Sequence, residues 1–289
     1  MKVAIIGGSG KMGQWFADFL LKEGKEVVII GRNQKKLLRV KQQLGVEVST
    51  DMEAVKGAGT ILISVPMDSF EEVIKQVSSY THPEQIIIDI TSIKVFPLEM
   101  MHKHIKMGRI LGVHPVFGPG AQNLVNRNFV LTPTNKEERT LAQKVKEYLR
   151  SKGAKVTLMT PKEHDEMMTV ILGLTHFIAI VSADTLLSFT NLKRMKAISG
   201  ITYEMLLTLI EGVISDDKEL YASLQMNLPN MVKIEELFQR RGEAWANLVK
   251  SGDKQKFIKR MDNLRNRLRK GIPDYGKAYE NMYKIVEEL

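Results

Sequence analysis

The chain of 289 residues contains no cysteine. Disulfide bonds, thiolate metal sites and cysteine nucleophiles are therefore excluded. No apolar run approaches the length of about 20 residues that a membrane-spanning helix needs. The sequence also begins directly with a predicted strand, without the features of a signal peptide. We therefore expect a cytoplasmic protein that does not bind membranes.

Acidic residues are fewer than basic ones, 33 against 42, which gives a net charge of +9. A basic surface can bind nucleic acid, but it also attracts small anions. The densest basic run, Lys254–Lys270, has helical spacing and includes Asp262. Phe257 is its only aromatic residue, and it matches no nucleic-acid-binding motif. We interpret it as a solvated helix face and expect a small anionic substrate rather than nucleic acid.

The first 13 residues carry the most informative motif. Met1–Ile6 is a predicted buried strand, and a glycine-rich turn follows it with the spacing G-x-G-x-x-G. In such a strand–turn–helix unit we assign Gly8 to the tight turn, Gly10 to the close approach of a pyrophosphate and Gly13 to helix packing. The phosphates of a dinucleotide would lie at the helix N-terminus. The predicted cofactor-binding residues of this turn are Gly8, Ser9, Gly10, Lys11, Met12 and Gly13.

Strands and helices alternate up to Thr160, and after it every predicted element is a helix. The predicted strands are Met1–Ile6, Glu26–Ile30, Val46–Val48, Thr60–Pro66, Gln85–Asp89, Ile110–Val113, Phe129–Leu131 and Lys155–Met159. The predicted helices are Lys11–Lys22, Lys35–Leu44, Phe70–Ser78, Glu137–Lys152, Glu163–Leu187, Ile201–Ile214, Glu219–Met226, Met231–Lys250, Lys254–Arg269 and Tyr275–Leu289. This pattern predicts an α/β fold: a Rossmann-type, mostly parallel sheet in residues 1–160, and an all-α substrate and dimerisation domain in residues 161–289.

Ligands of open parallel sheets bind beyond the carboxyl ends of the strands. The turn at Gly8–Gly13, the segment Ser64–Pro66 and the segment Asp89–Lys94 each follow a predicted strand, so we expect all three to border one crevice. The nicotinamide ring of a dinucleotide would lie at the segment Ser64–Pro66. Its predicted contacts are Ser64, Val65 and Pro66.

Arg32 follows the second predicted strand, where a Rossmann unit contacts the adenosine ribose. No Asp or Glu is present at residues 31–33 to accept a hydrogen bond from a 2′-hydroxyl. The Arg32 guanidinium offers several donors suited to a 2′-phosphate. The alternative is an arginine that simply faces solvent. The sequence therefore predicts NADP as cofactor, with NAD as the alternative.

Two polar residues follow strands on the predicted cofactor side. His114 opens a loop rich in glycine and proline, and histidine is the natural proton acceptor near neutral pH. The alternative is a structural loop histidine. Ser92 follows the strand that ends at Asp89, and it could donate to the imidazole or contact a substrate hydroxyl. The alternative for Ser92 is a helix N-cap.

His164 and His176 both lie on the long predicted helix, but their spacing places them on different sides of it, so they are not a metal pair. His176 shares an apolar side with Leu172 and Ile180, where a histidine is more often a core group than a ligand. The sequence contains no H-E-x-x-H, and we predict no metal site. The apolar length of the helix predicts a homodimer.

The chain resembles the prephenate/arogenate dehydrogenases of tyrosine biosynthesis, especially the dehydrogenase part of bifunctional chorismate mutase–prephenate dehydrogenases. The resemblance covers nearly the whole chain. The segments that carry it are Gly8–Gly13, Asp89–Lys94, His114–Pro119, Glu163–Asp165, Met168–Thr169, His176–Phe177, Leu220–Ala222, Gly252–Gln255 and Asp274–Tyr275.

The resemblance implies a function for several residues. In the family, the histidine that corresponds to His114 takes the proton of the ring hydroxyl while hydride leaves the same carbon for the nicotinamide. The serine that corresponds to Ser92 orients the substrate hydroxyl or the imidazole. The implied reaction converts prephenate to 4-hydroxyphenylpyruvate with loss of carbon dioxide, and aromatisation of the ring drives it.

One departure from the family concerns a substrate carboxylate, which a helix arginine of the second domain holds in the family. Ungapped comparison from Leu220–Ala222 back to Tyr203 places Glu204 at that position. Arg194 is the nearest replacement, and His176 could also contact the carboxylate. Prephenate and arogenate therefore both remain possible substrates. Two other functions also remain open: another small NADP-linked reductase, and a dinucleotide-binding protein without catalytic activity.

Overall fold

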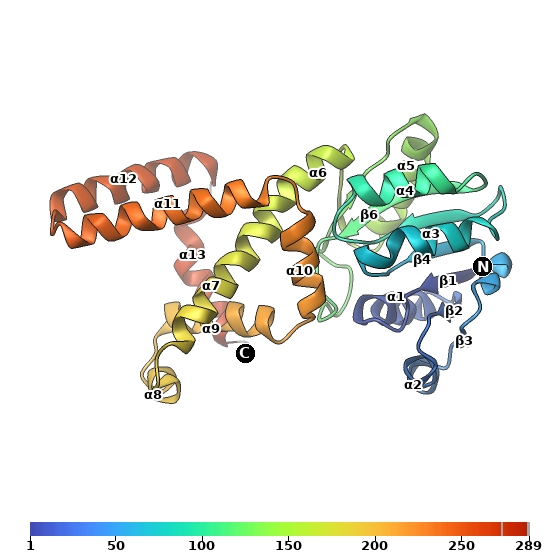
Figure 1. Ribbon diagram of the computed structural model, residues 1–289, viewed down its shortest axis with the longest axis horizontal. Coiled ribbons are helices and arrows are strands. Elements are labelled where there is room, and N and C mark those ends of the chain that lie inside the picture. The colour runs from blue at the N-terminus through green and yellow to red at the C-terminus, as the bar shows by residue number, and fades with distance from the viewer. Residues whose placement is uncertain (273, 288–289) are drawn as a thin grey trace. The chain divides into compact units, whose positions relative to one another are not determined.

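The structure is a computed structural model that describes residues 1–272 and 274–287 (Figure 1). The chain separates into two compact units, Met1–Met168 and Thr169–Leu289. The first combines a sheet with helices, and the second is helical. The predicted fold class is therefore confirmed.

The first unit is built on an eight-stranded sheet with the strand order β3-β2-β1-β4-β5-β6-β7-β8. β6 and β7 pair antiparallel, and all other neighbours pair parallel. The glycine turn after β1 therefore lies at the same edge as the ends of β4 and β5. The strands are β1 Lys2–Ile6, β2 Glu26–Ile30, β3 Glu47–Ser49, β4 Thr60–Ile63, β5 Ile86–Asp89, β6 Arg109–Pro115, β7 Asn128–Leu131 and β8 Lys155–Leu158.

Helices cover both faces of this sheet, because successive residues of a strand point to opposite faces. Val3 and Ile5 of β1 pack in one apolar core together with side chains of α1, α2 and α5. Ala4 and Ile6 pack in the other core, with η1, α3 and α4. The helices of the first unit are α1 Lys11–Lys22, α2 Gln34–Leu44, η1 Met52–Gly57, η2 Met67–Ser69, α3 Phe70–Ser78, α4 Val95–His104, α5 Lys136–Ser151 and α6 Pro161–Met168.

Two differences from the sequence-based expectation concern β6 and α4. β6 continues through His114 and Pro115, because His114 pairs with Val130 and Pro115 with Phe129 of β7. His114 therefore lies within a strand and does not open a loop. Helix α4 was not predicted, because Pro97 suggests a break and the helix has little amphipathic character. Proline is tolerated in the first turn of a helix, where N–H groups have no intrahelical partner.

The second unit is formed by helices. Phe177 of α7 contacts Phe238 of α11 edge to face, with ring centroids 6.0 Å apart, and Arg260 of α12 lies over Trp245 of α11 at 4.3 Å. The elements are η3 Thr169–Leu174, which is a π-helix, α7 Thr175–Leu187, α8 Leu192–Ala197, α9 Ile201–Ile214, α10 Lys218–Asn227, α11 Met231–Lys250, α12 Lys254–Gly271, η4 Tyr275–Lys277 and α13 Ala278–Glu287. The predicted end of the last helix, at Leu289, lies outside the described residues.

Within the part of the chain that the structure describes, one helix is long and apolar enough to cross a membrane by length and composition alone. It runs from Pro161 to Leu187, 27 residues, with a mean hydropathy of 1.9 over its most apolar stretch, of which 17% is buried. The expectation that no apolar run approaches this length is therefore wrong by this measure. Polar residues such as Thr175 and His176 interrupt the run in the sequence without lowering its average enough. Its exposed apolar side chains are Met167, Val170, Ile171, Val181 and Leu187.

Candidate active site

The glycine turn has the geometry of a phosphate-binding loop. Gly7 has a φ of +76°, and a Cβ there would lie 2.1 Å from the carbonyl oxygen of Ser64. A Cβ on Gly13 would lie 2.5 Å from the Cα of Gly8. The left-handed position is therefore Gly7 and not Gly8, while Gly13 allows the close packing predicted for it.

The start of α1 can hold a negatively charged group. Its N-cap is Gly10, and no side chain caps the helix. The first N–H groups of a helix have no intrahelical partner, and the dipole favours an anion there. Ser64–Pro66 lies directly beside this turn, because Ser64 N donates to Ile6 O and Val65 would contact a Cβ at Gly7. This arrangement fits the phosphates and nicotinamide end of a dinucleotide.

Arg32 lies between β2 and α2, at the same edge of the sheet as the glycine turn. Its side chain is exposed, and in residues 1–272 and 274–287 it forms no ion pair with a carboxylate. Asn33 next to it caps α2 by accepting a hydrogen bond from Lys36 N at 3.0 Å. The guanidinium is therefore available to a ligand at the expected ribose position.

His114 is buried near the end of β6, with 4% of its surface exposed. Its Nδ1 lies 2.8 Å from Nε2 of His164, a residue of α6 whose ring is fully buried. The two rings meet edge to face, with centroids 5.0 Å apart. Nε2 of His114 has no hydrogen-bond partner among the residues that the structure describes. This second nitrogen is therefore the one that can exchange a proton with a ligand.

Asp165 links His164 to the beginning of α4. Its Oδ1 lies 2.6 Å from His164 Nδ1 and accepts a hydrogen bond from Lys94 N at 2.7 Å. Its Oδ2 accepts from Val95 N at 2.9 Å. A carboxylate on the first free N–H groups of a helix is a strong cap. Asp165 therefore caps α4, which has no capping side chain of its own.

A buried ion pair lies next to these histidines. Lys94 and Asp89 are both 0% exposed, and Lys94 Nζ donates to Asp89 Oδ2 and, at 3.0 Å, to the backbone carbonyl of Val113. Asp89 Oδ1 also accepts a hydrogen bond from Thr91 N at 2.8 Å. The ammonium thus ties the end of β5 to the residue that precedes His114. Because the pair is satisfied by several hydrogen bonds, it can stay charged inside the protein.

Burial sets the protonation of both histidines. It lowers the pKa of His114 well below the ordinary value of 6.5, and His164 and the Lys94 ammonium lower it further. Burial also lowers the pKa of His164, although the hydrogen bond to Asp165 opposes part of this effect. Burial likewise lowers the pKa of Lys94, against the attraction of Asp89. Both imidazoles are therefore neutral at pH 7.

The sequence predicted only part of this cluster. His114 was expected to be functional, but His164, Asp165 and Lys94 were not given roles. The signal for them was the charged segment Glu163–Asp165 at the start of an apolar helix, which was noted only as a family motif. Ser92 lies half-buried in the loop before α4, and in the described part of the chain it forms no hydrogen bond with His114. It is not a helix N-cap either, since that position is Lys94.

The second unit contains the predicted substrate-binding residues. His176 of α7 meets Tyr221 of α10 edge to face, with ring centroids 4.7 Å apart, and its buried Nδ1 has no hydrogen-bond partner. It is therefore not a fully satisfied core group. Arg194 is exposed on α8, and Glu204 in the first turn of α9 accepts a hydrogen bond from Ser199 Oγ at 3.1 Å. Among the described residues, Arg194 and Glu204 form no hydrogen bond or ion pair with each other.

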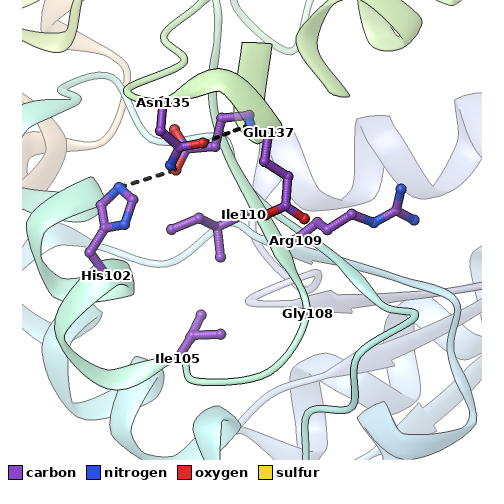
Figure 2. A pocket seen from close by; sticks show the side chains of 8 residues that line it. His102, Ile105, Gly108, Arg109, Ile110, Asn135 and Glu137 are labelled. Carbon is purple, nitrogen blue, oxygen red and sulfur yellow. Dashed lines mark hydrogen bonds and ion pairs between the residues drawn. The ribbon is translucent and has the colours of Figure 1, made fainter. Parts of the chain in front are cut away.

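A polar cavity of about 150 Å³ lies at the other edge of the sheet, where β6 begins (Figure 2). Figure 2 shows His102 of α4, Arg109 of β6 and Asn135, the N-cap of α5, around it. The glycine turn and His114 both lie at the opposite ends of their strands. This cavity is therefore separate from the candidate active site.

The glycine turn, the parallel sheet and the buried histidine define the first unit as a Rossmann-type dinucleotide-binding unit. Residues 16–158 match the family model described as the nucleotide-binding domain of prephenate dehydrogenase, and residues 160–263 match the model of its dimerisation domain. The chain belongs to the prephenate dehydrogenase family, whose members are NAD(P)-dependent oxidoreductases. The resemblance inferred from the sequence motifs is thus confirmed.

Two curated relatives show the extent of the match. A probable arogenate/prephenate dehydrogenase of Methanocaldococcus jannaschii is 34% identical over 265 residues, which cover 90% of this chain and 59% of the relative. The T-protein of Enterobacter agglomerans is 30% identical over 281 residues, which cover 96% of this chain and 69% of the relative. The chain thus spans about three fifths to two thirds of the length of these relatives.

Solved structures share the fold. A prephenate dehydrogenase of Aquifex aeolicus, in complex with hydroxyphenyl propionate and NAD⁺, superposes with a TM-score of 0.77 at 20% identity and covers 93% of this chain and 98% of its own. An arogenate dehydrogenase of Synechocystis superposes with a TM-score of 0.70 at 18% identity, covering 94% and 100%. At this identity the likeness supports the two-unit fold alone.

Because His114 and His164 are buried, we expect the protein to become less stable in acid. Because the folded protein keeps both rings neutral while the unfolded chain protonates them, the free energy of unfolding should fall as pH drops below 6.5. The limiting slope is about 1.4 kcal/mol per pH unit for each histidine. Urea unfolding between about pH 7.5 and about pH 5.5 measures it.

Replacing His164 by Gln should remove part of this slope. A wild-type free energy of unfolding that stays constant over the range would contradict the neutral, buried state of the two rings.

Proposed function

We propose that this protein is a prephenate dehydrogenase, which catalyses the NAD(P)-dependent oxidative decarboxylation of prephenate to 4-hydroxyphenylpyruvate. Arogenate is the alternative substrate. The observation that carries the proposal is the buried imidazole of His114, whose unpaired Nε2 lies in a Rossmann-type unit of this family. A cytoplasmic location is part of the same proposal.

The reaction needs an acceptor for the proton of the ring hydroxyl and an acceptor for the hydride that leaves the carbon bearing this hydroxyl. In the proposed mechanism His114 Nε2 takes the proton of the ring hydroxyl, and Ser92 contacts that hydroxyl or the imidazole. A bound nicotinamide supplies the hydride acceptor. The electron pair of the bond between the ring and its carboxylate then enters the ring, and carbon dioxide leaves. The proton held by His114 can return to the phenolate oxygen of the product, so the protein mainly positions the substrate and moves one proton.

Replacing His114 by Asn tests the catalytic proposal. The turnover number with prephenate should fall by roughly 10²–10⁴, the usual range for loss of a general base, while cofactor affinity stays the same. The formation of NADPH or NADH measures turnover. The same change at the exposed His82 is the control and should keep full turnover. A His114→Asn protein with near-normal turnover would remove His114 from the mechanism, and wild-type protein inactive with prephenate and arogenate would refute the function.

We propose NADP as the preferred cofactor, with NAD as the alternative. The exposed guanidinium of Arg32 and the absence of an acid at residues 31–33 support this choice. Charge-assisted hydrogen bonds contribute about 1.5–3 kcal/mol, which corresponds to roughly ten- to a hundredfold in affinity. Arg32→Ala should therefore weaken NADP binding by about this factor and leave NAD binding nearly unchanged, as titration calorimetry can measure.

The matched control is Arg139, an exposed arginine of α5, whose replacement by Ala should affect neither cofactor. Equal losses of NADP and NAD affinity in the Arg32→Ala protein would contradict a role for Arg32 in binding the 2′-phosphate of NADP.

The second unit is proposed to bind the anionic substrate. Burying a carboxylate without a partner is costly, so donor groups must face it. The buried Nδ1 of His176, which has no hydrogen-bond partner among the described residues, supports a role for this residue. Arg194 is exposed and forms no ion pair within residues 1–272 and 274–287, which supports it as the replacement for the family arginine. Glu204 could attract the ammonium group of arogenate, which would make it a specificity residue.

The Michaelis constants for prephenate and arogenate test this assignment. Arg194→Ala should raise the prephenate constant and leave NADP binding unchanged, whereas Lys193→Ala, a change at the exposed neighbour, should alter neither. Glu204→Gln should reduce activity with arogenate more than with prephenate. An unchanged prephenate constant in the Arg194→Ala protein would show that Arg194 is only a surface charge.

We also propose that the protein is a homodimer. The match of residues 160–263 to a dimerisation domain supports this assembly. The exposed apolar side chains of α7, including Val181 and Leu187, are what such an interface would bury.

A further inference from the structure

Three buried side chains form a hydrogen-bonded line within the first unit. Asp165 Oδ1 lies 2.6 Å from His164 Nδ1, and His164 Nε2 lies 2.8 Å from His114 Nδ1. All three residues are at most 4% exposed. No water is needed to complete the line. His164 uses both of its ring nitrogens in it, and His114 uses only Nδ1.

The direction of each hydrogen bond follows from the donors and acceptors available. Both oxygens of Asp165 accept backbone N–H groups, from Lys94 and Val95. A carboxylate can only accept, so the hydrogen of the third contact must come from His164 Nδ1. A neutral histidine has one N–H and one acceptor nitrogen. His164 Nε2 is then the acceptor, and His114 Nδ1 must donate to it. The lone pair of His114 is left on Nε2.

We propose that Asp165 and His164 are positioning residues that fix His114 in the tautomer whose Nε2 accepts the substrate proton. This inference rests on the proposed function, because it assigns that nitrogen its task. Without the line, a neutral histidine could carry its proton on either nitrogen, and the tautomer protonated on Nε2 could not act as a base.

The charges around the line set how readily His114 can hold a proton. The Lys94 ammonium, although paired with Asp89, still opposes an imidazolium at His114. When Nε2 of His114 takes a proton, its Nδ1–H becomes a stronger donor to His164, and the negative charge of Asp165 stabilises the cation through His164. The ring thus stays neutral at rest and holds the proton transiently.

A purely structural role is the competing explanation, since Asp165 also caps α4. The two explanations differ in what they predict for the ring nitrogens of His114. Protein labelled with ¹⁵N-histidine gives separate NMR signals for protonated and unprotonated ring nitrogens, and the spectrum of His114→Gln identifies those of His114. At neutral pH the wild-type protein should show His114 protonated on Nδ1 and unprotonated on Nε2.

Asp165→Asn is the informative variant, because an amide can donate to His164 Nδ1 and so reverse the line. His114 should shift towards the tautomer protonated on Nε2, and kcat should fall by roughly 10²–10⁴ with little change in the substrate KM. The matched control is Asn135→Ala. It removes the cap of α5, which accepts from Glu138 N at 2.9 Å, far from this line. It should lower stability but keep the tautomer and kcat.

The outcomes decide separately between this inference and the proposed function. Wild-type His114 protonated on Nε2 would overturn the inference without any variant, even if Asp165→Asn does not fold. A folded Asp165→Asn protein that keeps both the wild-type tautomer and kcat would also overturn it. Wild-type protein with the expected tautomer but no turnover of prephenate or arogenate would refute the proposed function and leave the hydrogen-bonded line in place.

Discussion

The carboxylate of Asp165 is the group on which the arrangement of the candidate site depends. It accepts the first N–H groups of α4 and at the same time contacts His164, which in turn holds His114. A helix start, a strand end and two imidazoles are therefore fixed by one side chain. Because the carboxylate is buried, each of these hydrogen bonds is stronger than it would be in water, and leaving any of them unmade would be costly.

The second constraint is the pair of Lys94 and Asp89. Two buried charges stabilise a protein only when hydrogen bonds satisfy both. Here the ammonium also donates to the carbonyl of Val113, so the pair fixes the distance between the ends of β5 and β6. The glycine turn after β1 lies at the same edge. The site thus combines a loop suited to phosphates with a rigid, desolvated support for one imidazole.

The sequence predicted the sheet and most helices, because glycine spacing and apolar periodicity are local signals. It also singled out His114. It did not predict α4, whose cap comes from Asp165 rather than from a neighbouring residue, or the extension of β6, which depends on pairing with β7. It also did not predict the contact of His164 with His114, because the two residues are 50 positions apart in the chain. Contacts between distant segments leave no periodic pattern, so they could not be inferred.

The cap that Asp165 provides also bears on how the first unit folds. Asp165 and Lys94 are 71 positions apart in the chain, yet the start of α4 relies on their hydrogen bond. Closing a segment of this length costs chain entropy that no nearby contact offsets in advance. Helix α4 therefore gains its full stability only when the chain beyond β8 has come back to the sheet. We therefore expect the cluster of His114, His164 and Asp165 to be completed only after the sheet has formed.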